Sequence, residues 1–168
     1  MTVRHLFVCM ASRTATGIDE ARPTVNVWAG AAIAGLAGGL VFGAMMQLLM
    51  PDILEMAIPG MFGLGPSLAI GWGIHLVNGA VFGLVYAAIA RFDPLAAYAE
   101  GLPSGIGLGI VYGVVIWAIA ASIVMPLWVG AMTPMSPPVP DVNPASLVGH
   151  AVFGAILGAL YPLHSARA

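Results

Sequence analysis

Four long apolar stretches dominate the chain and are separated by short polar or proline-containing connections. They cover residues 27–50, 67–90, 104–125 and 145–161. Each is close to the roughly 20 residues that an α-helix needs to cross the hydrocarbon core of a bilayer. None shows the strict alternation that marks a strand of a membrane β-barrel. The pattern predicts an all-α membrane domain of four transmembrane helices over residues 27–163.

Prolines mark the ends of these stretches. Pro51 follows the first, Pro66 precedes the second, and Pro126 follows the third. Proline suits the first turn of a helix and elsewhere removes a backbone donor, so it commonly marks a boundary. We therefore expect the third helix to end before Pro126.

The composition indicates that lipid is the solvent for most of the chain. Of the 168 residues, 60% are hydrophobic and only 7% are charged, whereas soluble domains carry roughly 25% charged residues. The net charge of −2 argues against nucleic acid as a partner. Cys9 is the single cysteine, which excludes a disulfide framework and a cluster of thiolate metal ligands.

Positive charge is confined to one side of this arrangement. The chain ends and the connection after the second helix hold all the basic residues, which are Arg4, Arg13, Arg22, Arg91 and Arg167. The other two connections hold acidic charges only, at Asp52, Glu55 and Asp141. Because arginine-rich short loops stay in the cytoplasm, we predict a multi-pass protein of the plasma membrane with cytoplasmic tails at 1–26 and 164–168. Residues 1–9 do not resemble a cleaved signal peptide, so the natural start is either Met1, followed by a flexible tail, or Met10.

The two halves of the chain resemble each other. Residues 39–43 (GLVFG) match 109–113 (GIVYG) at an offset of 70, and Met-Pro at 50–51 matches Met-Pro at 125–126 at an offset of 75. The third helix therefore carries about five extra residues before its Met-Pro pair. Beyond that pair, the second and fourth helices share the pattern His-x3-Gly-x3-Gly-x2-Tyr. We predict a tandemly duplicated helical hairpin with a pseudo-two-fold axis along the membrane normal.

Every predicted helix carries small residues at intervals of four. Small residues at this spacing let helix backbones approach closely within a bilayer. We expect helix-packing roles for Gly35, Gly39, Gly43, Gly79, Gly83, Gly105, Gly109, Gly113, Gly154 and Gly158. His75 and His150 continue these ladders and should face a helix interface. The glycines concentrate toward the cytoplasm, which predicts a wider, more polar and methionine-rich outer half containing any site.

His75 and His150 are the strongest candidate site residues, because ionisable residues inside a membrane are costly and often functional. If the pseudo-axis runs between the second and fourth helices, the imidazoles converge and can bind haem b or a metal such as copper. If the first and third helices lie on the axis, each histidine bonds a neighbouring helix and fixes packing. A solute or proton path is the third interpretation.

Other polar and sulfur-containing residues support these candidates. We expect Asn78 to lie one turn from His75 on the same face and Gln47 to form a hydrogen bond across helices. Thioethers suit Cu(I), which makes Met46, Met50 and Met125 weak metal-ligand candidates. Methionine is also an adaptable apolar filler, and this is the favoured interpretation.

The sequence carries no nucleotide-binding loop, hydrolase elbow or zinc-protease motif. The runs AGGLVFGAMM, HLVNGAVFGLVYA and GHAVFGAILGALYP resemble a group of small four-helix integral membrane proteins of archaeal and bacterial genomes. The resemblance covers about residues 27–163 and implies the same fold without catalytic residues. Some members carry a histidine-kinase label. The chain does not support that activity, because both candidate histidines lie inside membrane helices.

These observations favour a non-enzymatic integral membrane protein that acts as an assembly subunit or a homo-oligomer. The first alternative is a membrane redox or cofactor protein that binds haem b or copper through His75 and His150. The second alternative is a carrier of small solutes or ions.

Overall fold

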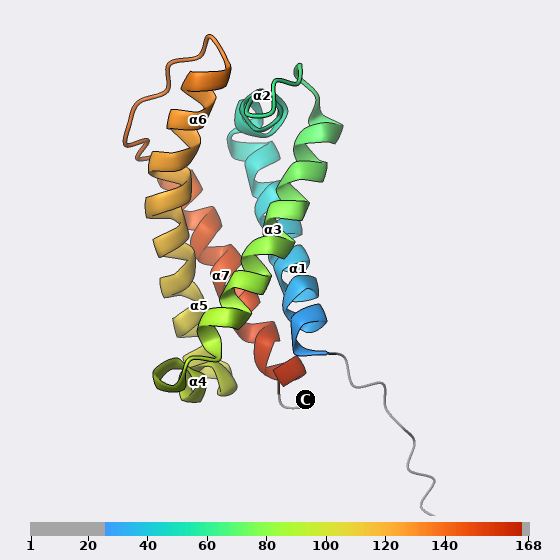
Figure 1. The fold of residues 1–168 in the computed structure, drawn as a ribbon, viewed down its shortest axis with the longest axis vertical. Coiled ribbons are helices and arrows are strands. Elements are labelled where there is room, and N and C mark those ends of the chain that lie inside the picture. Colours follow the sequence, from blue (N-terminus) through green and yellow to red (C-terminus); the bar gives the residue numbers. More distant parts are fainter. Residues whose placement is uncertain (1–25, 166–168) are drawn as a thin grey trace, which may run out of the picture.

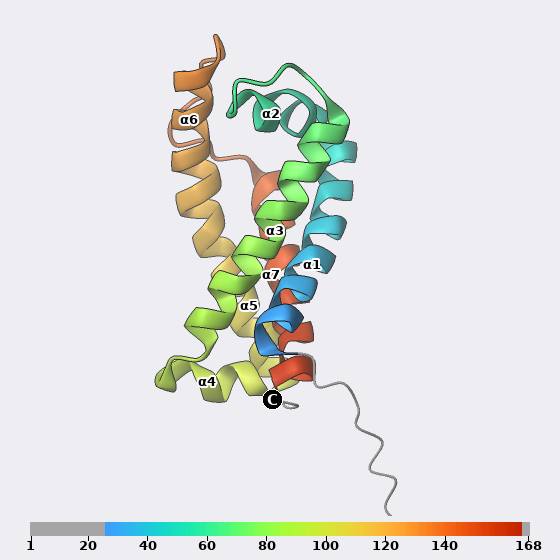
Figure 2. The ribbon, with the colours of Figure 1, turned by 45° about the vertical axis from the view of Figure 1, so that its right-hand side comes forward.

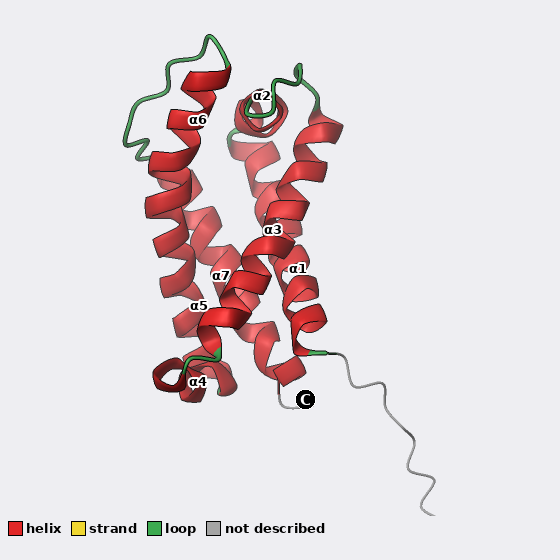
Figure 3. Ribbon diagram, viewed as in Figure 1, coloured by secondary structure: helices red, strands yellow, loops and turns green. Residues whose placement is uncertain are grey.

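The computed structural model describes residues 26–165. The predicted N-terminal tail, the choice between Met1 and Met10, and the last three residues lie outside this part of the chain. All elements in the described part are helical (Figure 3). The long ones are α1 (Val27–Leu49), α3 (Leu68–Ala90), α5 (Leu102–Ile116) with its continuations η2 (Trp117–Val124) and α6 (Met125–Met132), and α7 (Pro144–Ser165).

Four of these helices are long and apolar enough to cross a membrane. The third spans Leu102–Met132 because α5, η2 and α6 form one continuous helix. The prediction of an all-α protein with four membrane-spanning helices is confirmed, and the protein is a multi-pass membrane protein.

Two connections contain short helices that the apolar pattern did not predict. After α1 the chain forms a π-helical turn, η1 (Ile53–Ala57), followed by α2 (Ile58–Gly60). After α3 it forms α4 (Asp93–Glu100). Figure 1 places α2 and the end of α6 at one end of the molecule, and α4 with the end of α7 at the other. We refer to these as the α6 end and the α4 end.

The long helices pack in the order α3, α1, α7, α5. α1 packs against both α3 and α7, and α5 packs against α7, whereas the described residues of α3 make few contacts with α5 or η2. The first and fourth helices therefore pack directly against each other. α3 approaches α5 near the α4 end and separates from η2 and α6 toward the α6 end (Figures 1 and 2).

Glycines of the predicted ladders lie where helix backbones touch. A Cβ atom added to Gly35 would overlap the carbonyl oxygen of Gly79, which joins α1 to α3. A Cβ at Gly109 would overlap the carbonyl oxygen of Gly154, and a Cβ at Gly154 would overlap the carbonyl oxygen of Gly109. These contacts join α5 to α7. Backbone contact of this kind maximises van der Waals packing, the main attraction available between helices in lipid.

Two glycines outside the predicted ladders join α1 to α7. A Cβ at Gly38 would lie 2.9 Å from a ring carbon of Phe153. A Cβ at Gly149 would overlap the ring of Phe42. Each helix therefore places an aromatic ring over a glycine of the other.

Pro126 does not end the third helix, contrary to the sequence prediction. A proline cannot donate to the carbonyl four residues earlier, which here belongs to Ser122. That carbonyl accepts a hydrogen bond from the backbone N–H of Asp141 instead, at 2.8 Å. The connection after α6 thus satisfies the group that proline leaves free, and the helix continues to Met132.

The same arrangement recurs in the connection after α1. Pro59 cannot donate to the carbonyl of Glu55, and this carbonyl accepts from the backbone N–H of Ser67 at 2.9 Å.

The π-helical stretch before Pro126 also has a counterpart in the sequence. It lies where the third helix carries its extra residues, and wider π turns accommodate added residues within a helix.

Two glycines of α5 allow a matched test of this packing. A Cβ added to Gly107 would lie in open space, whereas one added to Gly109 would meet the backbone of α7. We expect Gly109→Ala to lower the free energy of unfolding by about 1–3 kcal/mol, as for other overpacked sites, and Gly107→Ala to leave it unchanged or raise it slightly. Reversible unfolding in mixed micelles, followed by circular dichroism, measures both. Equal stability of the two variants would show that α5 and α7 do not meet at Gly109.

Candidate functional site

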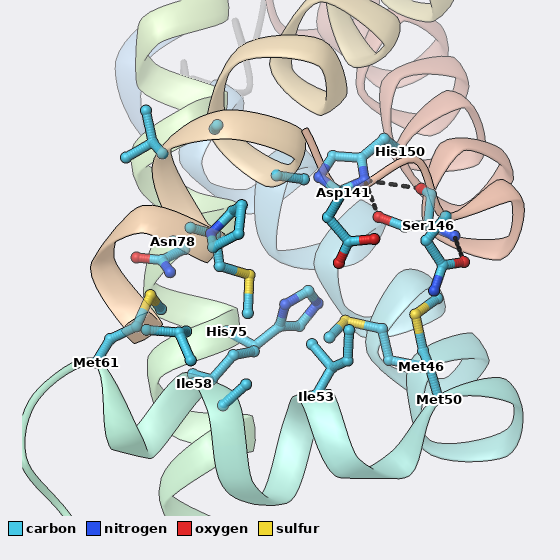
Figure 4. A pocket seen from close by; sticks show the side chains of 18 of the residues that line it. Met46, Met50, Ile53, Ile58, Met61, His75, Asn78, Asp141, Ser146 and His150 are labelled. Carbon is cyan, nitrogen blue, oxygen red and sulfur yellow. Dashed lines mark hydrogen bonds between the residues drawn. The ribbon is translucent and has the colours of Figure 1, made fainter. Parts of the chain in front are cut away.

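The described residues enclose a cavity of about 440 Å³ in the half of the molecule near the α6 end. Its walls come from α1, α3, α7, η1, η2 and α6, together with the connection that precedes α7. The volume falls in the range typical of small-molecule sites. Figure 4 shows the side chains that surround it, with His75 and His150 on opposite helices. This is the half in which the sequence predicted the wider, methionine-rich space.

His75 ties α3 to α1. Its side chain is only 9% exposed, and its Nε2 lies 3.0 Å from the carbonyl oxygen of Gly39. A carbonyl can only accept, so Nε2 carries the proton and donates, and in the neutral imidazole Nδ1 keeps its lone pair. Nδ1 has no hydrogen-bond partner among the described residues.

His150 is held by its own helix. Its Nδ1 lies 2.8 Å from the carbonyl oxygen of Ser146 and 3.5 Å from the hydroxyl of the same residue. Nδ1 therefore donates to the carbonyl, and Nε2 is the acceptor nitrogen of the neutral ring. Nε2 likewise has no partner within the described part of the chain. The two histidines thus present opposite ring nitrogens to the cavity.

Phe42 packs against both imidazoles. Its ring centroid lies 5.3 Å from that of His75 and 4.6 Å from that of His150, both in edge-to-face geometry. The sequence analysis did not select Phe42. It lies three residues after Gly39 and four before Met46, which is the spacing of one helix face, so its place beside the ladder was a usable signal. Through Phe42 one buried ring orients both candidate histidines.

The remaining predicted residues divide between the cavity and the surface. Met46, Met50 and Met125 line the cavity. Asn78 also lines it, and its amide has no hydrogen-bond partner among the described residues. Gln47 lies outside the cavity, where its Oε1 accepts from Trp72 Nε1 at 2.8 Å across α1 and α3.

Two carboxylates that the sequence pattern did not select as site residues belong to the cavity. Asp52 and Asp141 both line it. The backbone bond from Asp141 to Ser122 fixes the position of this residue, and Figure 4 shows its carboxylate pointing toward the space between the two imidazoles. No lysine or arginine of the described residues lines the cavity.

Tyrosines close the cavity toward the α4 end. The hydroxyl of Tyr112 donates to the carbonyl of Phe82 at 2.6 Å, which joins α5 to α3. The ring of Tyr86 packs edge-on against Tyr112 and Tyr161, with centroid separations of 5.2 and 5.4 Å. Farther toward this end, the guanidinium carbon of Arg91 lies 5.3 Å from the centre of the Trp28 ring.

The chain matches no protein-family model, no curated protein and no solved structure. Within the described residues, no group of three or more His, Cys, Asp or Glu side chains is placed to hold a metal ion. For a copper ion bound by His75 and His150, the thioethers of the lining methionines are the further ligands available. The cavity offers hydrogen-bond acceptors on two imidazoles, two carboxylates and one amide, set in an apolar lining.

The two histidines should contribute differently to stability. His75→Phe removes a hydrogen bond between helices and should lower the free energy of unfolding by about 0.5–2 kcal/mol, the usual worth of such bonds in membranes. His150→Phe removes a bond within one helix and should cost less than about 0.5 kcal/mol. Unfolding of both variants in mixed micelles tests the difference. A larger loss for His150→Phe would contradict the assigned hydrogen bonds.

Proposed function

We propose that this protein is a non-enzymatic, multi-pass membrane protein that binds a small molecule in the cavity between its helices. One observation carries the proposal. Three polar groups, Nδ1 of His75, Nε2 of His150 and the Asn78 amide, border the cavity without partners among the described residues. These groups are open to the cavity, so a bound molecule can form hydrogen bonds with them in place of water.

This proposal keeps the non-enzymatic role expected from the sequence and adds a ligand to it. A role as an assembly subunit or homo-oligomer is compatible with ligand binding, since the walls of the cavity come from one chain. Binding is the role that the described contacts favour.

We also propose that the fold arose by tandem duplication of a helical hairpin, with a pseudo-two-fold axis along the membrane normal. The support is that glycines at equivalent positions of the two halves, 70 and 75 residues apart, make equivalent contacts between helices. Gly39 approaches Gly79 in the first hairpin, and Gly109 approaches Gly154 in the second. Each pair joins the first helix of its hairpin to the second.

The orientation follows from the distribution of charge. We propose that the α4 end faces the cytoplasm of a cell bounded by this plasma membrane. Arg91 lies at that end, whereas Asp52, Glu55 and Asp141 belong to the connections at the α6 end. The cavity then lies in the outer half of the bilayer.

Cysteine labelling in intact cells tests this orientation. In a Cys9→Ala background, Gly65→Cys at the α6 end should react with a membrane-impermeant maleimide, and Ala97→Cys on α4 should react only after permeabilisation. Both positions are exposed, so access depends on the side of the membrane alone. The opposite pattern of labelling would reverse the proposed orientation.

A cavity-filling variant tests ligand binding. Ala121 lines the cavity, whereas Ala118 lies three residues earlier on the same helix, is exposed and does not line it. Native mass spectrometry of protein extracted from its own membranes should detect a bound small molecule in the wild type and in Ala118→Phe. The molecule should be missing from Ala121→Phe. A wild-type protein that carries no bound molecule would contradict the proposal.

Haem b or copper is a second candidate ligand. Two imidazole acceptors and the thioethers of Met46, Met50 and Met125 border one cavity, and metal-binding histidines usually donate their other nitrogen to a carbonyl, as both do here. An absorption spectrum and elemental analysis of the same preparations identify this case by a Soret band or by bound copper. Either signal should disappear in Ala121→Phe and in both histidine variants.

A further inference from the structure

We infer that the ligand is a lipophilic cation, a molecule with an apolar body and a positively charged head. This inference rests on the proposed ligand-binding function and specifies the chemical class of the ligand. It depends on the sign of the charges around the cavity, on the chemistry of its walls and on the side from which it can be reached.

The charges around the cavity are of one sign. Asp52 and Asp141 are the formally charged residues of its lining, and no basic residue among the described ones lines it. Neither carboxylate has an ion-pair partner within the described part of the chain. A carboxylate beside an apolar space attracts a cation and repels an anion.

The neutral polar groups favour the same class of ligand. The free ring nitrogens of His75 and His150 are acceptors and cannot donate. His75 is only 9% exposed, and it lines the cavity. A protonated amine would donate to these nitrogens and to the carboxylate of Asp141, whereas a carboxylate or phosphate head would find acceptors and negative charge.

The walls suit a molecule with an apolar body and a positively charged head. Aromatic rings line several sides of the cavity, contributed by Phe42, Phe82, Phe153 and Trp128. The faces of such rings attract cations. The thioethers of the lining methionines adapt to the shape of an apolar ligand.

The cavity also borders the open side of the bundle. Its walls include Asn78 and Phe82 of α3 and Ala120 and Val124 of η2, yet α3 and η2 make few contacts with each other. At the α4 end of this opening, the bond between Tyr112 and Phe82 joins the helices. Entry from the surrounding lipid between α3 and η2 is part of this inference and favours a lipophilic ligand over a water-soluble one.

Binding of tritiated tetraphenylphosphonium, a lipophilic cation, to the full-length protein in phosphatidylcholine nanodiscs tests this inference. We expect saturable binding that decylammonium displaces at concentrations about tenfold lower than decanol, a difference of about 1.4 kcal/mol. Decanoate, with the same chain and a negative head, should displace it least. Equal displacement by the three competitors would overturn the inference, because binding would then depend on the apolar chain alone.

Three variants locate the binding. Asp141→Asn should weaken binding of the cation by about tenfold. Asp93→Asn removes the same charge from α4, at the other end of the molecule, and should bind as the wild type does. Ala121→Phe should abolish binding. Unchanged binding in Asp141→Asn or in Ala121→Phe would place the cation elsewhere and overturn the inference.

The experiments can contradict the ligand-binding proposal and the lipophilic-cation inference independently of each other. If native mass spectrometry detects a molecule that Ala121→Phe excludes, while tetraphenylphosphonium does not bind saturably, the cavity binds a ligand of another class and only the present inference falls. If no molecule is bound and no cation binds, both proposals fall.

Discussion

Direct contact between helix backbones is the interaction on which the rest of this structure depends. In lipid, apolar side chains gain little by leaving the solvent, so helices associate where glycine lets their backbones touch. Such contacts join α1 to α3 through Gly35 and Gly79, and α5 to α7 through Gly109 and Gly154. Because these contacts bring four apolar helices together, they also place the polar residues of the chain around a common space.

The cavity exists because one possible contact between helices is not made. Gly38 and Gly149 let α1 and α7 approach each other over the rings of Phe153 and Phe42. At the proposed repeat offsets, the equivalents of these glycines are Leu108 and Ile74. Residues of this size do not permit the close backbone approach that glycine permits. In the proposed duplication, the two halves therefore diverged at the residues that decide whether the bundle closes or remains open on one side.

The sequence predicted the fold well where a single physical rule decides the outcome. The length and composition of the apolar stretches predict four membrane helices, and four-residue glycine spacing predicts where two pairs of them meet. The rule that a proline ends a helix failed at Pro126. The carbonyl of Ser122, which Pro126 cannot satisfy, accepts a hydrogen bond from Asp141, nineteen residues farther along the chain. A pattern local to the helix cannot reveal such a partner. The helix order could not be predicted either, since it depends on Gly38 and Gly149, which lie outside the ladders.

The candidate site was predictable to a similar degree. Its histidines were selected because ionisable residues are costly in a membrane, Asn78 because it lies one turn from His75, and the three methionines because thioethers suit Cu(I). All of these line the cavity, whereas Gln47, which was also selected, does not. Asp141 was not selected, because a carboxylate in a short connection is usually solvated. Its position depends on the backbone bond that draws the connection onto the helix.

The chemistry of the cavity follows from how its histidines are held. A neutral imidazole has one donor and one acceptor nitrogen. In both histidines a backbone carbonyl takes the donor, so the nitrogen that remains can only accept. Had either ring been held by a backbone N–H, the cavity would present a donor and would suit an anionic or carbonyl-bearing molecule. In the proposed function, the carbonyls of Gly39 and Ser146 would therefore select the kind of ligand without touching it, and the carboxylate of Asp141 would add a charge of the matching sign.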